Sequence, residues 1–547
     1  MSDALSLTGS GSTPAPVGGS ARGPNLDGRT HPAGIGLFFL VLAGGVGYAL
    51  FNLITDMQAA GQPPLAIGAF ALLGLALLIA LGFEFVNGFH DTANAVATVI
   101  YTHSLPPVAA VVYSGVLNFL GVVVSTGAVA YSVVTLLPVE LVLKAGSSAG
   151  YAMIFALLIA AIIWNLGTWA LGLPNSSSHA LIGSVLGVGF ANQILAPEGS
   201  ETSGVQWDQA WSVLRALLFS PVVGFVMAGL LLLAMRFVIR NRALYREPEA
   251  DAPPPLWIRA LLILTCGGVS FAHGGNDGQK GMGLIMLILI GAAPTAYALN
   301  RTMAESATPH FVDVSERARS VFRDRAEQAP VPSAADARAQ ITKALGKKEL
   351  DRPEIYAALA ALSDDVATKV KEYGAIRHVP AEATPNLRND MFLASDAIHS
   401  LEKREGLFVG EEAKTLRAYE TSLNDGTRYI PTWVKVSVAL ALGLGTMVGW
   451  KRIVVTVGSR IGKKHLTYAQ GASAEITAAG TIGLAEAYGL PVSTTHILSS
   501  GVAGTMAANG SGLQWATVRN LAVAWLLTLP AAITLAGLLY AGLRVVL

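Results

Sequence analysis

Residues 172–183 read GLPNSSSHALIG and place three hydroxyls and a histidine between two apolar runs of the chain. The same pattern returns at residues 489–500 as GLPVSTTHILSS. Proline followed by serine or threonine and then an apolar run is typical of a helix start. Free backbone amides and the positive end of the helix dipole suit such a start to bind an anion. The two copies predict two anion-binding helix ends, Ser176, Ser177, Ser178 and His179 in the first, and Ser493, Thr494, Thr495 and His496 in the second.

The composition places the chain in a membrane. Of its 547 residues 52% are hydrophobic and 13% are charged, about half the ~25% charged fraction of soluble domains. Apolar runs near the ~20 residues that cross a bilayer recur from 36–55 to 516–545. A β-barrel would show alternating polarity instead of solid apolar blocks. We therefore predict an all-α polytopic protein in the lipid bilayer, and the net charge of +1 does not indicate a nucleic-acid surface.

Charged residues gather in one segment. Residues 301–430 hold 19 of the 37 lysines and arginines and 21 of the 36 acidic residues. Mixed charges with helix-like apolar spacing predict a soluble helical insert, which we interpret as a spacer rather than a regulatory domain. The predicted divisions are a disordered polar tail at 1–34, a first membrane region at 35–300, a charged cytoplasmic insert at 301–430 and a second membrane region at 431–547.

Short loops orient the membrane part. Loops 56–65 and 194–211 contain no lysine or arginine, whereas two other connections are rich in them. The positive-inside rule places basic connections in the cytoplasm and the two loops without basic residues outside. The basic residues are Arg236, Arg240, Arg242 and Arg246 in one connection, and Lys451, Arg452, Arg460, Lys463 and Lys464 in the other.

A second motif is also duplicated. NGFHDTANA at 87–95 is answered by HGGNDGQKG at 273–281. Asp91 lies 83 residues before Pro174, whereas Asp277 lies 214 residues before Pro491. The excess of 131 residues is almost the length of the charged insert, so the two halves share one spacing once the insert is removed. This arrangement indicates an ancient duplication.

Duplicated halves with polar, Gly- or Pro-interrupted segments are typical of secondary transporters, which bind substrate near the membrane midplane between broken helices. Irregular backbone at that depth is tolerated where it lines a cavity. We expect the helices to break at the Gly-rich HGGNDGQKGMG segment, residues 273–283, and at the two Pro-headed hydroxyl motifs.

Carboxylates within the membrane are costly and are functional candidates by default. Asp91 and Asp277 stand beside amide side chains, and oxygen-rich clusters of this kind suit a hard cation or a proton. Lys280 takes the position that corresponds to Asn94, where it would pair with Asp277 or contact the anion directly. His179 and His496 are candidates for proton handling or for contacts to the anion. The expected cation-coupling set is Asp91, Asn94, Asn87, Asp277, Asn276 and Glu475.

These motifs together resemble the PiT family of inorganic phosphate transporters, which carries an acidic-amide motif near the start of each half and a Pro-x-Ser-hydroxyl-hydroxyl-His element later in each. The resemblance is closest to the bacterial Pit-type low-affinity carriers and extends over 66–300 and 431–547. It implies symport of phosphate with cations by an inverted-repeat fold of roughly ten to twelve helices, as a homodimer in the bacterial inner membrane, with no cofactor. The implied phosphate-binding residues are Ser176, Ser177, Ser178, Ser493, Thr494, Thr495, Asp91, Asp277 and Gln279.

The chain departs from the sodium-coupled members in three places. It reads Phe-His-Asp at 89–91 where they have Ala-Asn-Asp, and it has Lys280 and Asn118 where they have an asparagine and a glutamate. These changes remove two amides and a carboxylate, which favours protons over sodium as the co-transported ion. The Pit-type resemblance also implies transport of phosphate complexed with a divalent metal.

Two alternatives differ in substrate or class. Hydroxyls and helix ends do not separate phosphate from other tetrahedral oxyanions such as sulfate or arsenate. A membrane-embedded phosphotransferase or hydrolase would need a phosphate-binding Gly-rich loop or a metal-binding HExxH pattern, and the membrane regions contain neither. We therefore predict a transporter and not an enzyme.

Overall fold

The computed structural model describes most of the chain beyond the N-terminal tail. Its described residues are 24, 26, 31–91, 93–137, 146–196, 205, 207–249, 252–404 and 406–547. The predicted tail at 1–34 lies almost wholly outside them, and the first helix begins at Pro32. Within them the structure contains helices and no strand, with one isolated β-bridge between Gly462 and Leu513. The predicted all-α class is confirmed.

The first membrane region supplies ten α-helices in the described part of the chain. They are α1 (Pro32–Ala59), α2 (Ile67–Asp91), α3 (Ala93–Tyr101), α4 (Pro107–Val124), α5 (Ala128–Val134), α7 (Ser148–Ala170), α8 (Ser177–Ile194), α9 (Trp207–Val238), α10 (Leu256–Ala292) and α11 (Pro294–Tyr297). A 3₁₀ turn, η1 (Arg242–Tyr245), lies between α9 and α10.

The second membrane region completes the bundle with α17 (Thr432–Thr446), α18 (Lys451–Ser459), α19 (Tyr468–Ala487), α20 (Thr494–Ala508) and α21 (Trp515–Val546). Among the described residues, seven helices are long and apolar enough to cross a membrane, or eight if α17 and α18, bent by 66°, form one span. Helices α8, α19 and α20 lie in the same bundle but are not among the seven. The predicted count of roughly ten to twelve spans therefore stays a prediction.

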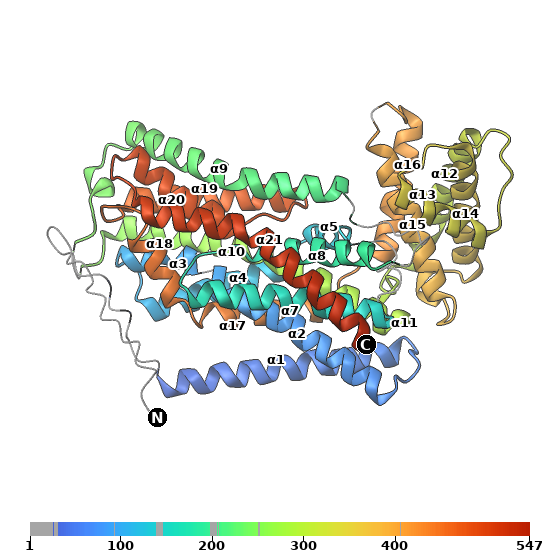
Figure 1. Ribbon diagram of the computed structural model, residues 1–547, viewed down its shortest axis with the longest axis horizontal. Helices are drawn as coiled ribbons and strands as arrows, with labels where there is room; N and C mark the ends of the chain where they lie inside the picture. Colours follow the sequence, from blue (N-terminus) through green and yellow to red (C-terminus); the bar gives the residue numbers. More distant parts are fainter. Residues whose placement is uncertain are drawn as a thin grey trace, which may run out of the picture.

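The insert forms a separate helical bundle beside one end of the membrane part (Figure 1). Its helices are α12 (Thr308–Arg325), α13 (Ala334–Lys347), α14 (Pro353–Glu372), α15 (Thr384–Glu402) and α16 (Glu411–Thr427), with the short turns η2 (Glu305–Ala307) and η3 (Ile376–His378). They enclose their own apolar core, which includes Phe311, Phe322, Leu359 and Leu393.

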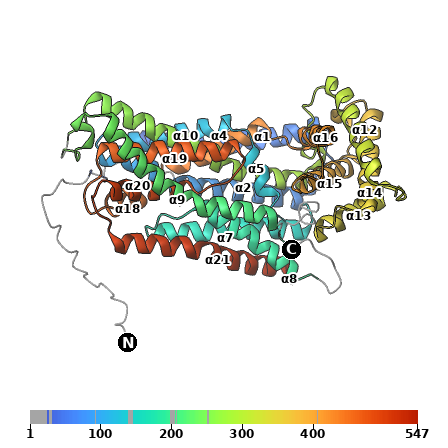
Figure 2. The same ribbon diagram turned by 90° about the horizontal axis from the view of Figure 1, so that it is seen from above.

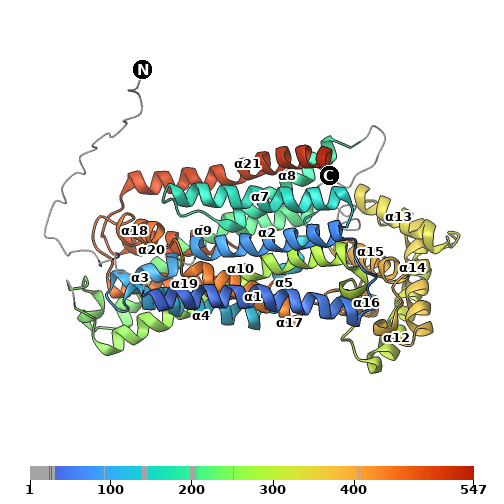
Figure 3. The same cartoon turned by 90° about the horizontal axis from the view of Figure 1, so that it is seen from below.

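Tight helix crossings hold the two halves of the membrane part together. Helix α8 packs along α21, and α20 packs along α9; Figures 2 and 3 show α8 and α21 side by side. At each crossing a glycine faces a backbone oxygen. A Cβ added to Gly187 would lie 2.2 Å from the oxygen of Ile533, and one added to Gly504 would lie 2.0 Å from that of Phe225. Small residues at such contacts let membrane helices approach closely.

The expected helix break in the Gly-rich segment is wrong. Helix α10 runs without interruption through residues 273–283. Its glycines serve close packing instead, since a Cβ on Gly274 would lie 2.2 Å from the backbone oxygen of Asn118 on α4. Glycine lowers helix propensity by only ~1 kcal/mol, which packing against neighbours can offset.

The basic loops and the insert lie at opposite ends of the bundle (Figure 1). At one end Arg236 donates to Asn509 (2.6 Å) and Gln514 donates to the oxygen of Ser459 (3.2 Å). At the other end, beside the insert, Tyr297 and Trp433 both donate to Asp56 (3.2 and 2.8 Å). The insert therefore shares its side with loop 56–65. A cytoplasmic insert and cytoplasmic basic loops are incompatible, and the two expectations cannot both be right.

Candidate functional site

The repeated Gly-Leu-Pro element ends one helix and prepares the next. Gly172 and Gly489 have φ values of 68° and 65°, the left-handed region that glycine adopts without a steric penalty. After each glycine a leucine amide bonds back to the preceding helix, Leu173 to Thr168 (3.0 Å) and Leu490 to Ala485 (2.8 Å). This is the Schellman ending of a helix, and the following proline prevents its continuation.

The hydroxyls then start α8 and α20 as predicted. The Ser176 and Ser493 side chains are N-caps that accept from the amides of His179 and His496, each at 3.1 Å. Behind each cap stand two further hydroxyls on the first turn, and all of these side chains are buried. The predicted helix starts at both Pro-headed motifs are confirmed.

The structure joins each acidic motif to the hydroxyl motif of the other half. Thr495 Oγ1 donates to Asp91 Oδ1 (2.8 Å). Lys280 Nζ donates to Asp277 Oδ1 (2.7 Å) and to the Ser178 hydroxyl. Ser178 Oγ in turn donates to the oxygen of Val492 (2.8 Å). The four motifs thus form one centre with two crossed pairs.

The two aspartates also lie close to each other. Ligand atoms of Asp91, His273 and Asp277 are all within 4.8 Å of one another, and all three residues are buried. His90 Nδ1 lies 3.1 Å from Asp91 Oδ1, and its Nε2 lies 3.2 Å from the hydroxyl of Thr168. A cation or a proton at this point would contact both halves of the protein.

Two histidines meet where α8 and α20 begin. The rings of His179 and His496 are 4.5 Å apart between centroids, and His496 stacks on Trp525 at 4.1 Å. His179 Nδ1 lies 2.9 Å from Ser176 Oγ. The two predicted histidines therefore lie together at the helix ends, within reach of an anion bound there.

The remaining predicted residues have distinct places. Asn276 bonds to the loop before α20, through the oxygen of Leu490 (3.1 Å) and the amide of Val492 (3.4 Å). Ser177 accepts from Asn165 (3.1 Å), and Thr494 Oγ1 is buried without a hydrogen-bond partner among the described residues. The side chain of Asn94 lies outside the described residues.

Two predicted residues face elsewhere. Gln279 binds the amide of Val129 (2.9 Å) and donates to Glu486 (3.0 Å), because two residues beyond Asp277 correspond to ~200° around a helix. Glu475 accepts from the hydroxyls of Thr98 and Thr265. Thr265 precedes Asp277 by twelve residues on α10, about 18 Å along the axis. Glu475 thus belongs to a separate polar cluster.

Comparison with known proteins decides the family. Residues 87–536 match the family model described as "Phosphate transporter family". The chain belongs to this family. It is 42% identical over 486 residues to the low-affinity inorganic phosphate transporter PitA of Escherichia coli (strain K12), covering 86% of this chain and 96% of that one. It is 40% identical over 498 residues to PitB of the same strain, covering 87% and 98%.

Among solved structures, the chain is similar to one described as "The sodium-dependent phosphate transporter". The likeness has 20% identity and a TM-score of 0.46, and covers 87% of this chain and all of that one. The family model and the bacterial relatives establish a multi-pass membrane protein of a transporter family, not of an enzyme family.

Sequence reasoning missed two residues of this family member's centre. His273 joins the aspartates, as described above. Glu84 is fully buried on α2, accepts from Asn87 (3.4 Å), and has its Oε1 without a hydrogen-bond partner among the described residues. A Cβ on Gly281, next to Lys280, would lie 2.3 Å from that oxygen. Glu84 interrupts the apolar run LGFEFV at 81–86, a signal that could have identified it.

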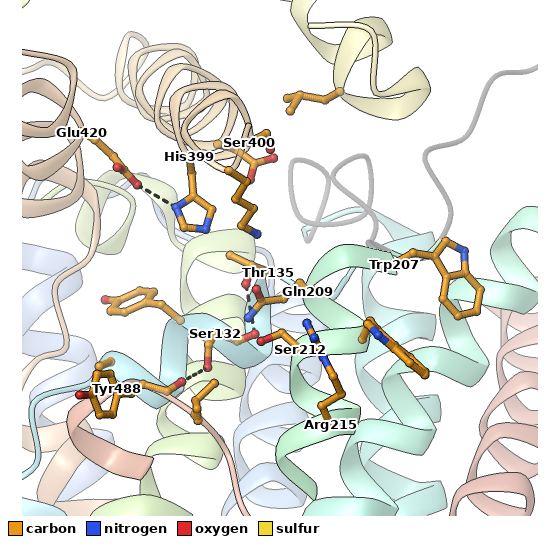
Figure 4. Close-up of a pocket in the computed structure, with 18 of the residues that line it drawn as sticks. Ser132, Thr135, Trp207, Gln209, Ser212, Arg215, His399, Ser400, Glu420 and Tyr488 are labelled. Atoms are coloured by element: carbon orange, nitrogen blue, oxygen red, sulfur yellow. Dashed lines mark hydrogen bonds and ion pairs between the residues drawn. The ribbon is translucent and has the colours of Figure 1, made fainter. Parts of the chain in front are cut away.

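A large cavity lies between the membrane helices and the insert (Figure 4). Its volume is about 1410 Å³, and its wall includes the segment 487–490 that leads into the second hydroxyl motif. Ser132 of α5 donates to the oxygen of Gly489 (2.7 Å) at this wall. On the insert side, His399 pairs with Glu420 (3.4 Å). The cavity therefore adjoins the loop on which the start of α20 depends.

Proposed function

We propose that the protein is a secondary active transporter that imports inorganic phosphate across the bacterial inner membrane together with protons. The crossed contacts of the four motifs carry this proposal. Two helix starts with free amides and hydroxyls suit a tetrahedral oxyanion, and the contacts Thr495–Asp91 and Ser178–Lys280 couple them to ionisable groups. Family membership and the names of the bacterial relatives support phosphate as the substrate.

Charge balance supports co-transport of a cation. The centre contains three buried carboxyl groups, Asp91, Asp277 and Glu84, and one buried lysine, Lys280. With all of them ionised, the centre is negative before any phosphate arrives. Because like charges in a low-dielectric site repel strongly, phosphate requires added positive charge. The imidazoles of His90 and His273 lie 3.1 Å and 3.7 Å from carboxylate oxygens of Asp91 and Asp277, so a proton bound at either imidazole would add its charge beside a carboxylate.

The metal-binding geometry favours a second form of the cargo. Asp91, His273 and Asp277 offer two carboxylates and an imidazole within 4.8 Å, a mixed ligand set that suits a divalent transition metal better than sodium. A phosphate complexed with such a metal would place its anion at the helix starts and its metal at this triad. We propose this complex as a second substrate.

Labelled phosphate uptake into proteoliposomes tests the proposal. We expect uptake under an imposed proton gradient, no stimulation by an imposed sodium gradient, and stronger competition by arsenate than by sulfate. Uptake driven by sodium alone would overturn proton coupling. Uptake of sulfate that phosphate does not inhibit would favour the alternative oxyanion substrate.

A further inference from the structure

Lys280 occupies a position that is built for a small cation. Its Nζ donates to three oxygens of three chemical kinds, namely the carboxylate of Asp277 (2.7 Å), the hydroxyl of Ser178 and the backbone carbonyl of Val492 (3.3 Å). These atoms come from α10, from the first turn of α8 and from the loop before α20. The lysine side chain is 1% exposed.

Such a set of oxygens is what a bare hard cation uses for ligands. The ammonium group supplies the same single charge and three donors for the three oxygens. In the first half, the residue three positions after the aspartate is Asn94 and not a lysine. The two halves therefore differ, since the second carries a lysine beside its aspartate, whereas the first carries His90, which is charged only when protonated.

We propose that Lys280 is a built-in cation that permanently fills the cation position of the second half. The inference rests on the proposed phosphate transport and specifies its coupling. Apart from the metal of a metal–phosphate cargo, coupling cations then bind on the first-half side of the centre, at Asp91. Each transported phosphate requires one external positive charge fewer than in a protein with two exchangeable positions.

The variant K280N tests this inference, because asparagine is the residue at the corresponding place in the first half. In proteoliposomes without sodium we expect phosphate uptake to fall by about 10-fold or more, since the buried Asp277 carboxylate loses the ammonium group at 2.7 Å and keeps His273 at 3.7 Å. Sodium or methylammonium should restore most of the uptake in K280N and leave the wild type unchanged. The same ions should raise the Tm of K280N, because a ligand that binds the folded state stabilises it.

A matched control is K435N. Lys435 is a partly buried lysine on α17 that donates to the backbone oxygen of Ser125 (2.8 Å), and K435N should gain no response to either ion. The double variant D277N/K280N lacks the carboxylate and should also show no response. Purification of K280N in sodium and in choline media adds a readout of folding, because the proposal predicts a higher folded yield in sodium.

Three results would overturn the inference. In the first, K280N takes up phosphate at the wild-type rate and gains no response to sodium or methylammonium. In the second, K280N is folded, but neither ion changes its uptake or its Tm. In the third, K280N is unfolded in both media. The second result would instead indicate direct contact between Lys280 and phosphate. Failure of the proposed function is distinguishable, because the wild type would then take up no phosphate while the Tm response of K280N still reports on the cation position.

A second inference comes from the cavity of Figure 4. Five cationic side chains line it against two acidic ones: Arg215, Lys348, Lys403, Arg404 and Arg428 against Asp396 and Glu420. Glu420 pairs with His399 and Arg404 pairs with Asp351, and burial raises the pKa of Asp396. Arg215 of α9 has no hydrogen-bond or ion-pair partner among the described residues, and Figure 4 shows it beside Ser212 and Gln209. The cavity therefore carries a surplus of positive charge.

The position of the cavity in the bundle indicates on which side of the membrane it lies. The short basic loops lie at the opposite end of the bundle (Figure 1), and the positive-inside rule depends on short loops rather than on long inserts. The basic end is thus cytoplasmic and the insert is extracytoplasmic, the reverse of the orientation expected from the charge of the insert.

We infer that the insert and α9 enclose an extracytoplasmic vestibule that concentrates inorganic phosphate before it reaches the start of α20. A cleft lined by one sign of charge raises the local concentration and the association rate of an oppositely charged substrate. The inference also rests on the proposed phosphate import.

The double variant R215Q/K403Q tests the vestibule. We expect a KM for phosphate that is about 3- to 10-fold higher at low ionic strength, an unchanged kcat, and a difference that disappears in high salt. The matched control is K414Q/R417Q on the exposed side of α16, which should behave like the wild type. A KM that stays at the wild-type value at low salt would overturn the vestibule, whereas absence of uptake by the wild type would overturn the proposed function.

Cysteine labelling tests the orientation with little background, because Cys266 is buried and is the single cysteine of the chain. A membrane-impermeant maleimide should label K414C in right-side-out vesicles and R242C only in inverted ones. The opposite pattern would overturn the extracytoplasmic vestibule.

Discussion

The membrane part and the insert are both helical and both bury apolar side chains, but they differ in what they expose and in the ionisable groups at their centres. In the membrane part Asp91, Asp277 and Lys280 are buried, whereas Leu218 and Leu526 are 66% and 74% exposed. In the insert Phe311 and Phe322 are buried, whereas most charged pairs lie on the surface. Water drives apolar residues inward in the insert, but lipid supplies no such force in the membrane part.

The buried ionisable groups of the membrane part serve function, whereas the apolar core of the insert serves stability. Apolar packing does not explain why ionisable groups are buried in the membrane part, because each of them costs free energy to keep within the bilayer. The insert owes its fold to its apolar core and is expected to tolerate surface changes.

The largest expected effect is the loss of transport in D91N and in D277N. Each change removes a carboxylate that contacts a hydroxyl motif or Lys280, so net phosphate uptake should be abolished while the protein remains inserted and folded. Proteoliposome uptake measures the first and size-exclusion chromatography the second. D313N, which changes an exposed aspartate of the insert, is the control. Normal uptake by either variant would remove that aspartate from the mechanism.

A large loss of stability is expected from R338M in the insert. Arg338 holds the buried carboxylate of Asp390 by two bonds (2.5 and 2.8 Å), and removal of one partner of a buried pair costs about 3 kcal/mol or more. Thermal unfolding, monitored by limited proteolysis of the insert, measures the loss of stability. R317M, which breaks an exposed pair, should cost about 0–1 kcal/mol. Equal losses for the two variants would contradict the comparison.

The contribution of the Arg338–Asp390 pair to the stability of the insert depends on pH in a definite direction. Burial raises the pKa of Asp390 above its usual value of 3.8, so the folded insert binds a proton more tightly than the unfolded chain. The stability from this group is present below pH 3.8 and is lost as the pH rises through the raised pKa. R338M should therefore be least destabilised in acid, and R338M/D390N should recover most of the loss.

A smaller effect on transport is expected from T495V. The change removes the hydrogen bond to Asp91 but keeps the shape of the side chain, and a bond to a charged group contributes about 1.5–3 kcal/mol. Uptake should fall by about 10-fold or more. T534V alters an exposed threonine on α21 that donates to the backbone oxygen of Pro530 in its own helix and should have no effect. An unchanged rate in T495V would show that the crossed contact is not used in transport.

The smallest effect is expected from glycine substitution at a helix crossing. A Cβ in G504A would meet the backbone oxygen of Phe225 at 2.0 Å, and such overpacking costs about 1–3 kcal/mol. The Tm in detergent should fall. G480A, whose Cβ would meet no atom within 4 Å, should leave the Tm unchanged or raise it slightly. A fall of the same size in G480A would show that the loss reflects glycine itself and not the crossing.

Local patterns in the sequence determined the class of the protein and its repeats. Apolar blocks predict membrane helices because lipid requires every backbone group to bond within the chain. The Gly-Leu-Pro-hydroxyl element predicts both helix starts, because a Schellman ending and an N-cap depend only on neighbouring residues. The candidate carboxylates were found because a charge is costly inside an apolar run. The same signal marks Glu84 and could have identified it.

Only the tertiary structure decided which of these elements meet. The sequence showed that both motifs are duplicated but not which copies meet: Thr495 contacts Asp91 and Ser178 contacts Lys280 across the halves. It likewise grouped Gln279 and Glu475 with Asp277, whereas the turn of α10 and the length of that helix place them apart. The glycines of α10 read as breaks until their packing partners were known. Contacts between distant segments depend on how helices pack, and no local pattern in the chain encodes that packing.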